Sequence, residues 1–274
     1  MTHSHTRFGD EEVGRAVARA LGVDLRERAD TGAFARIDGS VAAVEHLRGS
    51  AGNIHAGALL AIADTVAGIC GGLAALPKWV VSTNLMVQCA AVAAQGPLEV
   101  QAHALRAGRH AVVTEVQIVD VPTRNVLTDG VLTSAVLTPE AGPPPFARPL
   151  ELHAPEINGS GVAPIREFFG IRERDSASVT LDITAEVRNP WGILHGGVSA
   201  ALIDASAEHA ATVPNGVTTD AVLHFLAPGR AGPVVASAES LGVRADGEVL
   251  RVTVTDEGAD RLLAIAVATV RAPA

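Results

Sequence analysis

The chain repeats one pattern twice, and this repetition limits the available folds more than any other feature. Ile54-His55-Ala56-Gly57 and Leu194-His195-Gly196-Gly197 each open an apolar run that contains an aspartate, Asp64 or Asp204, at an offset of 140 positions. Two further landmarks recur at an offset of 136: Ser82-Thr83-Asn84 with Thr218-Thr219-Asp220, and Gly96-Pro97 with Gly232-Pro233. Because all landmarks keep their order, the 274 residues predict two copies of one module.

The repeats also set the expected domain boundaries. We assign residues 1–140 to an N-terminal module with a leading helix over Glu11–Leu21, and residues 163–274 to a C-terminal module. Residues 141–162 are rich in proline and glycine and lack apolar periodicity, which is typical of a linker.

Each copy is expected to contain the same elements in the same order. The first copy has short strands near Ala33–Arg36 and Val41–Val44, a helix over Ala56–Leu76, and strands over Leu85–Ala90, Leu98–Ala107, Ala111–Val119 and Val131–Leu137. The second copy has a short helix near Ile165–Phe169, a strand near Ser178–Ile183, a helix over Gly196–Val213, and strands over Val222–Leu226, Val234–Gly242, Val249–Thr255 and Leu262–Val270. The strands alternate with period two, whereas the long helices are apolar nearly all round. We therefore predict an α+β protein in which each module wraps a curved antiparallel sheet around a central helix, with a pseudo-twofold axis between the modules.

Composition excludes several classes of protein. A net charge of −9 argues against a nucleic-acid partner. Cys70 and Cys89 lie in apolar segments without metal-ligand spacing, which predicts buried thiols and no metal site. Met1–Asp10 contains no apolar signal region, so we expect a cytoplasmic protein. Ile54–Leu76 is apolar enough for a membrane helix, but Asp64 within it favours a buried core helix and no membrane partner.

Two features of the second copy carry chemistry. Asp204 lies inside an apolar helix, where an unpaired carboxylate is costly or takes up a proton. It could simply face a polar gap, but its recurrence as Asp64 favours a functional role. Gly196 and Gly197 open that helix, where free N–H groups and the positive end of the helix dipole suit an oxyanion, although a tight turn would need small residues too. His195 is expected to hold the turn rather than to act as a base.

The run Asn189-x-x-Gly192-x-x-His195-Gly196-Gly197, followed by Asp204, resembles the pattern of the phenylacetic-acid-degradation (PaaI-like) branch of hotdog thioesterases. The resemblance covers nearly the whole chain as two tandem hotdog units, a double hotdog. It implies hydrolysis of an acyl-CoA to a carboxylic acid and CoA without a cofactor. It also implies that the aspartates act as base or nucleophile, that the Gly196 amide polarises the thioester carbonyl, and that Asn189 orients substrate or water. Residues expected to border the substrate are His55, Gly57, Thr83, His195, Gly197 and Thr219.

The first copy departs from this pattern. Gly49 stands where the second copy has Asn189, and Ala56 replaces the first glycine of the pair. Family sites combine the asparagine and glycine amide of one unit with the acid of the other. We therefore expect one fully equipped site, which uses Asp64, and a weakened site at Asp204. Asp64→Ala should abolish turnover, while Asp204→Ala should leave much of it.

Several alternatives stay open. An enoyl-thioester hydratase of the same fold would carry its catalytic histidine in an Asp-x-x-x-x-His motif, which we do not expect in this sequence. A protein that binds acyl-CoA without turnover is also compatible with the loss of asparagine at Gly49. Arg106, Arg109 and His110, at the end of a predicted strand, form either a phosphate-binding cluster or a solvated turn. Two chains could also pair as a homodimer of double hotdogs, and the sequence does not decide this.

Overall fold

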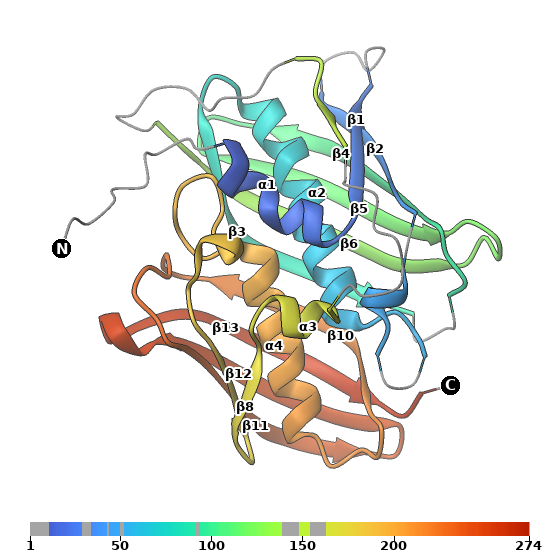
Figure 1. The fold of residues 1–274 in the computed structure, drawn as a ribbon, viewed down its shortest axis with the longest axis vertical. Helices are drawn as coiled ribbons and strands as arrows, with labels where there is room; N and C mark the ends of the chain where they lie inside the picture. The colour runs from blue at the N-terminus through green and yellow to red at the C-terminus, as the bar shows by residue number, and fades with distance from the viewer. Residues whose placement is uncertain are drawn as a thin grey trace.

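The fold was analysed in a computed structural model, which describes residues 11–28, 34–42, 44–49, 52–90, 94–138, 148–153 and 163–273 (Figure 1). Met1–Asp10, in which the sequence analysis found no signal region, lies outside the described residues, as does most of the predicted linker. Within the linker range, residues 148–153 are described and include a short strand, β7 (Glu151–Leu152), which pairs with the first strand of the chain. The domain boundaries at residues 140 and 163 stay predictions.

The N-terminal module consists of α1 (Glu11–Ala20), β1 (Val23–Glu27), β2 (Arg36–Val41), the 3-10 helix η1 (Glu45–Leu47), α2 (Ala56–Ala75), β3 (Trp79–Cys89), β4 (Leu98–Ala107), β5 (Ala111–Asp120) and β6 (Val126–Leu137). The C-terminal module consists of α3 (Ile165–Phe168), β8 (Arg172–Asp175), β9 (Ser178–Leu181), η2 (Ala185–Val187), α4 (Gly196–Ala210), β10 (Val217–Phe225), β11 (Val234–Arg244), β12 (Gly247–Asp256), η3 (Glu257–Ala259) and β13 (Arg261–Arg271). Apart from β7, η3 and the length of the first helix, the two lists correspond one to one.

The start of the first module differs from the prediction. The sequence analysis placed two short strands at Ala33–Arg36 and Val41–Val44, and this was wrong, because one strand, β2, fills the interval between them. The middle of β2 is polar and contains a glycine, so its sequence resembles that of a turn. Gly39 is needed there because a Cβ atom at this position would lie 2.7 Å from Leu25 Cδ2 and 2.9 Å from the Asp24 carbonyl oxygen on neighbouring β1. The analysis also missed β1 and β8, which are short and rich in charged residues.

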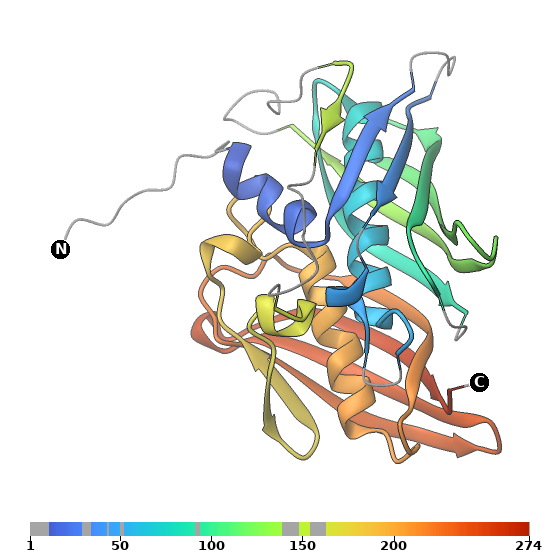
Figure 2. The ribbon, with the colours of Figure 1, turned by 45° about the vertical axis from the view of Figure 1, so that its right-hand side comes forward.

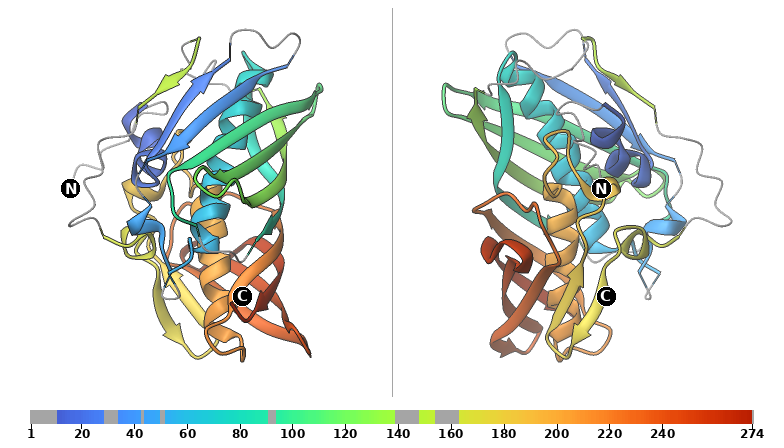
Figure 3. Two further views of the ribbon diagram at one scale, coloured as in Figure 1. Left: turned by 90° about the vertical axis from the view of Figure 1, so that its right-hand side faces the viewer. Right: turned by 60° about the vertical axis from the view of Figure 1, so that its left-hand side comes forward.

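The described strands form one antiparallel sheet in the order β7-β1-β2-β4-β5-β6-β3-β10-β13-β12-β11-β9-β8. The order is nearly symmetric about the β3–β10 pair, which joins the two modules. The sheet curves around two central helices, α2 and α4, which follow each other along the long axis (Figures 1 and 2). In the side view of Figure 3, strands of the first module lie on both sides of α2. The predicted α+β class with two tandem hotdog units is confirmed.

Helix α2 is the one helix among the described residues that is long and apolar enough to span a membrane. Most of it is buried inside the protein, including Asp64 in its middle. Burial on nearly every side explains why its sequence is apolar all round instead of amphipathic. It is the core helix that the sequence analysis predicted.

Helices α2 and α4 approach each other closely through glycine. A Cβ atom at Gly57 would lie 3.2 Å from Ala201 Cα, and one at Gly197 would lie 3.0 Å from Ala61 Cα. The two contacts are related by the 140-residue offset, so they are copies of one interaction. Because glycine has no Cβ atom, the first turn of each helix can lie directly against the second turn of the other.

The junction between the modules gives the first testable prediction. Leu85 on β3 and Leu223 on β10 are paired across the junction and are fully buried. Replacing either with alanine should lower the free energy of unfolding by about 2–5 kcal/mol, because each change leaves a cavity. The measurement is urea unfolding of each variant. Met86→Ala, at a neighbouring position that is 48% exposed, serves as the control and should change stability by less than about 0.5 kcal/mol. Equal effects at Leu85 and Met86 would contradict this packing.

Candidate functional site

One cavity of about 840 Å³ lies between the two modules and is lined by residues of both. The N-terminal module contributes Asp64, Thr65 and Gly68 of α2 with Ser82 and Thr83 of β3, and the C-terminal module contributes Asn189, Trp191, His195 and Gly196. The predicted residues Asp64, Asn189, Gly196, His195 and Thr83 therefore share one cavity.

Asp64 is the buried carboxylate of this cavity. Ser82 Oγ donates a hydrogen bond to Asp64 Oδ1 at 2.7 Å. On the other side, Gly196 lies so close that a Cβ atom there would be 2.7 Å from Asp64 Oδ2. The start of α4 is thus directly opposite the carboxylate of α2, and any larger residue than glycine at position 196 would displace it.

The electrostatic surroundings of Asp64 keep its carboxyl group a weak acid. Burial raises the pKa of Asp64, and the charge of His195 with hydrogen bonds from Ser82 and the Gly197 amide offsets this only in part. Burial also lowers the pKa of His195. Burial therefore disfavours the charged form of both groups.

Each central helix begins at a histidine that caps it. His195 Nδ1 accepts a hydrogen bond from the Gly197 N–H at 2.9 Å, and His55 Nδ1 accepts one from the Gly57 N–H at 3.2 Å. Both backbones are extended at the histidine. Gly196 is the first residue of α4, so its N–H group has no carbonyl partner inside the helix and can serve a ligand.

Asn189 lines the cavity within the loop that precedes α4. Its side-chain oxygen accepts hydrogen bonds from the N–H groups of Trp191 at 3.0 Å and Ile193 at 3.3 Å. Because the oxygen is used by the loop, the NH₂ group is the part of this side chain that can donate to a substrate.

The two threonines predicted beside the acids occupy equivalent β-bulges. The register of β3 shifts between Ser82 and Asn84, around Thr83, and that of β10 shifts between Thr218 and Asp220, around Thr219. Thr83 Oγ1 donates to the Thr133 carbonyl oxygen at 2.9 Å, so it supports the bulge. The hydroxyl that bonds Asp64 belongs to the preceding Ser82, which the sequence analysis did not single out. Its place in the repeated Ser-Thr-Asn landmark was the available signal.

A pair of stacked tryptophans joins the modules at the cavity wall. The rings of Trp79 and Trp191 are 3.7 Å apart at an angle of 16°. Trp191 Nε1 also donates to the Val80 carbonyl oxygen at 3.2 Å. These are the only two tryptophans of the chain. Trp191 lies inside the recognised motif, but nothing in the sequence predicts its stacking partner.

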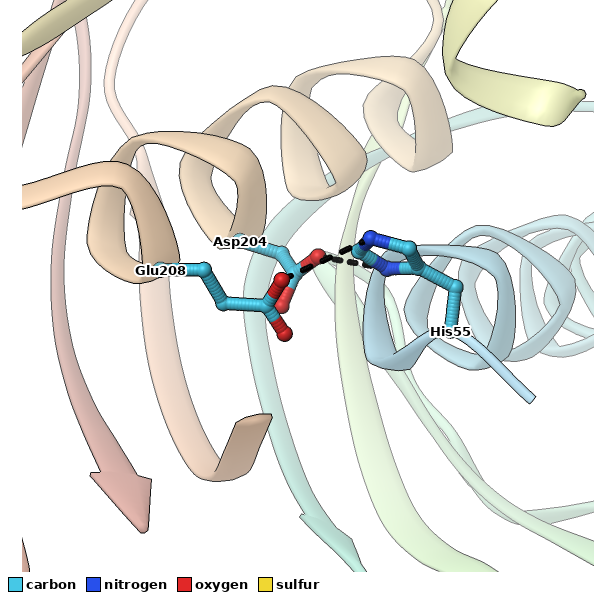
Figure 4. Close-up of side chains that lie close together, drawn as sticks. All are labelled: His55, Asp204 and Glu208. Atoms are coloured by element: carbon cyan, nitrogen blue, oxygen red, sulfur yellow. Dashed lines mark ion pairs between the residues drawn. The ribbon is translucent and has the colours of Figure 1, made fainter. Parts of the chain in front are cut away.

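Asp204 has very different surroundings. Its Oδ2 atom lies 2.9 Å from His55 Nδ1 and 3.0 Å from Arg166 Nη2. The same Arg166 nitrogen donates to Glu208 Oε2 at 2.8 Å. Figure 4 shows His55 of one module directed toward Asp204 and Glu208 of the other. Gly57 abuts Asp204 Oδ2, although its counterpart in the repeat is Gly197 and not Gly196, the glycine that abuts Asp64.

These contacts shift the pKa of Asp204 in the direction opposite to that of Asp64. Burial opposes ionisation of Asp204, but the charges of His55 and Arg166 outweigh burial and lower its pKa. Glu208 takes the opposite direction, since burial and the charge of Asp204 raise its pKa. A carboxylate that is ionised and paired with a guanidinium is a poor base.

His55, Asp204 and Glu208 have the donor atoms of a metal site, and these atoms lie within 4.8 Å of one another. Arg166 contacts both carboxylates, so a cation of the protein already neutralises them. The absence of a metal ion from the chemistry stays a prediction.

The expectation that the hydratase motif Asp-x-x-x-x-His is missing was wrong, because this spacing occurs at Asp204 and His209. The structure turns His209 away from the cavity, because its Nε2 atom lies 2.6 Å from the Asp175 carbonyl oxygen at the edge of the sheet. His209 is also absent from the residues that line the cavity. The arrangement therefore does not support a hydratase.

Comparison with known proteins agrees with this geometry. Residues 51–127 match the Thioesterase superfamily, and residues 184–271 match the Acyl-CoA thioesterase N-terminal domain family. A 1,4-dihydroxy-2-naphthoyl-CoA hydrolase of Listeria monocytogenes serotype 1/2a (strain 10403S) is 34% identical over 119 residues, which cover 39% of this chain and 93% of that protein.

Solved structures share the fold over nearly the whole chain. A candidate thioesterase II from Thermobifida fusca YX aligns with a TM-score of 0.63 and 16% identity, covering 94% of this chain and 99% of that one. A hot dog fold protein from Alicyclobacillus acidocaldarius aligns with a TM-score of 0.58 and 15% identity over the same shares. Assignment to the PaaI-like branch stays a prediction. The chain belongs to the thioesterase superfamily and is a double-hotdog thioester hydrolase.

Proposed function

We propose that the protein hydrolyses an acyl-CoA in the cavity that contains Asp64. The observation that carries this proposal is the direct opposition of the Asp64 carboxylate, from one module, and the start of α4 at Gly196, from the other. A thioester carbonyl group placed beside both residues in the cavity has the Asp64 carboxylate as a base and the Gly196 N–H as a donor to its oxygen.

The reaction follows from these groups. Asp64 removes a proton from water as the water oxygen bonds to the carbonyl carbon, and the Gly196 N–H stabilises the resulting oxyanion. When the intermediate collapses, the carbon–sulfur bond breaks, and the leaving thiolate takes the proton from Asp64. General-base assistance of this kind contributes about 10²–10⁴ in rate, and a preorganised amide donor about 3–4 kcal/mol. Direct attack by Asp64 on the carbonyl carbon uses the same geometry.

The choice of CoA as the thiol rests on two observations. The similar Listeria monocytogenes protein is an acyl-CoA hydrolase by name. In addition, Lys78 and Arg230 line the cavity of a protein whose net charge is −9. They can attract the phosphates of CoA locally, although the whole protein repels an anion.

The two aspartates provide a matched test. Asp64→Asn should lower kcat/KM for an acyl-CoA by at least about 10²-fold, because it removes the base while its oxygen can still accept the Ser82 hydrogen bond. Asp204→Asn should keep most of the activity, since Asp204 is held by Arg166 and His55. Thiol release from a panel of acyl-CoAs measures both. Loss of activity only in Asp204→Asn, with normal folding, would overturn the assignment of Asp64.

The pH dependence should separate the two aspartates as well. A carboxyl whose folded pKa is raised stabilises the protein at low pH and loses that contribution as the pH rises through the folded pKa. Asp64→Asn should therefore become more stable than wild type as the pH rises, while wild-type kcat/KM increases over the same range. Asp204→Asn should be less stable than wild type at neutral pH, because Asp204 has a lowered pKa. Thermal unfolding and kcat/KM across a pH series test both signs, and parallel curves for the two variants would contradict them.

Charge reversal at the cavity tests recognition of CoA. Lys78→Glu and Arg230→Glu should each raise KM for an acyl-CoA several-fold, and added salt should reduce the difference. Neither should alter turnover of the matching acyl-N-acetylcysteamine thioester, which has no phosphate. Arg109→Glu is the control, because Arg109 is exposed and does not line the cavity. An equal effect on both thioesters would show that these cations do not bind the nucleotide.

A further inference from the structure

The pseudo-twofold relation allows the two sites to be compared position by position. The end of α1 and the end of α3 make the same turn. Gly22 and Gly170 have φ angles of 68° and 67°. Leu21 N–H donates to the Val17 carbonyl at 3.0 Å, and Phe169 N–H donates to the Ile165 carbonyl at 3.0 Å. These pairs are all 148 positions apart, so this offset relates α1 to α3.

The alignment pairs residues of contrasting size at the two sites. The offset of 148 makes Ala18 the counterpart of Arg166. On the central helices, the offset of 140 makes Gly68 the counterpart of Glu208, each one turn beyond its aspartate. The first site therefore has two of the smallest side chains where the second has two long, charged ones.

In the first module these positions border open space. Ala18 and Gly68 both line the 840 Å³ cavity. A Cβ atom built on Gly68 would find its nearest neighbour, Leu132 Cδ2, 3.9 Å away. The helix face beyond Asp64 is thus free to receive a ligand.

In the second module the residues at the same positions, Arg166 and Glu208, form an ion pair. Arg166 Nη2 lies 2.8 Å from Glu208 Oε2 and 3.0 Å from Asp204 Oδ2. Glu208 Oε1 also accepts a hydrogen bond from the Thr218 N–H at 3.2 Å. Separating Arg166 from this cluster would leave His55 alone beside two partly or fully buried carboxylates, which is unfavourable. We therefore expect the Arg166–Glu208 ion pair to stay formed.

We propose that the Arg166–Glu208 ion pair closes the second site, and that Ala18 and Gly68 keep the first one open as the channel for the acyl group. The chain then binds one acyl-CoA, and positions 18 and 68 limit the size of its acyl group. The channel suits a bulky apolar acyl group, aryl or medium-chain, since its wall contains the following residues: Ile69, Trp79, Val80, Leu137, Leu150 and Leu152. This inference rests on the proposed hydrolysis of acyl-CoA.

Filling the channel at Gly68 tests its part in specificity. Gly68→Leu should lower kcat/KM for decanoyl-CoA and benzoyl-CoA by about tenfold or more, because the side-chain atoms beyond Cβ would occupy space that the acyl group needs. Acetyl-CoA turnover, whether fast or slow in wild type, should change much less. Gly68→Ala is the matched control and should keep the wild-type preference, since a Cβ atom fits there. An unchanged ratio between long and short substrates in Gly68→Leu would overturn the channel.

Binding stoichiometry tests the closure independently of turnover. A non-hydrolysable thioether analogue of decanoyl-CoA, titrated by calorimetry, should bind wild type at one site per chain. Arg166→Ala/Glu208→Ala should bind two, as His55 remains beside Asp204 to partner it. Two sites in wild type, or one in a folded double variant, would overturn the closure. If wild type binds one analogue but hydrolyses no acyl-CoA, the proposed function fails while the closure stands.

Discussion

The close crossing of α2 and α4 is the contact on which the rest of the structure depends. Gly57 lies against Ala201 and Gly197 against Ala61, where a Cβ atom would be only 3.2 and 3.0 Å from the Cα atom of the alanine. The crossing buries the two apolar helices against each other and holds β3 next to β10, so that a single sheet can wrap both. It also brings the first turn of each helix to the aspartate of the other. A thioesterase site therefore arises from packing that the core requires anyway.

The same crossing produces two sites with opposite properties. At Asp64 the neighbouring groups are a serine hydroxyl, a capping histidine and a glycine, so burial dominates and the carboxyl is held as a weak acid. At Asp204 an arginine and a histidine outweigh burial, and the carboxylate is paired. The two sites have equivalent backbone elements, and they differ in the side chains around the aspartate, above all in Arg166 of α3 and Glu208 of α4. Duplication within one chain, unlike a symmetric dimer, lets the two copies acquire different side chains.

Burial makes the ionised form of Asp64 unfavourable, whereas the ion pairs of Asp204 stabilise its ionised form. Ionising Asp64 in its buried position opposes folding at the pH where catalysis needs the charge. Ser82 hydrogen-bonds this carboxyl group, and the sheet junction and the Trp79–Trp191 stack join the two modules that form the cavity. Strained or unpaired groups at functional sites are commonly tolerated in this way, because the rest of the fold is consistent at every level.

The sequence by itself determined the repeat, both central helices, most strands, and the grouping of Asp64 with Asn189 and Gly196. The repeat and its elements follow from local periodicity and from motifs that recur in the same order. The grouping of Asp64 with Asn189 and Gly196 follows from the resemblance to the hotdog thioesterases, whose sites combine residues of two units. Only the tertiary structure decided that Ser82 bonds Asp64, that Trp79 stacks on Trp191, and that Arg166 neutralises Asp204. It also decided where β1 and β2 lie, since Gly39 in β2 is explained by a neighbouring strand and not by a turn. Each of these contacts joins residues that are far apart in the sequence, and neither periodicity nor motif spacing predicts which of them become neighbours in the fold.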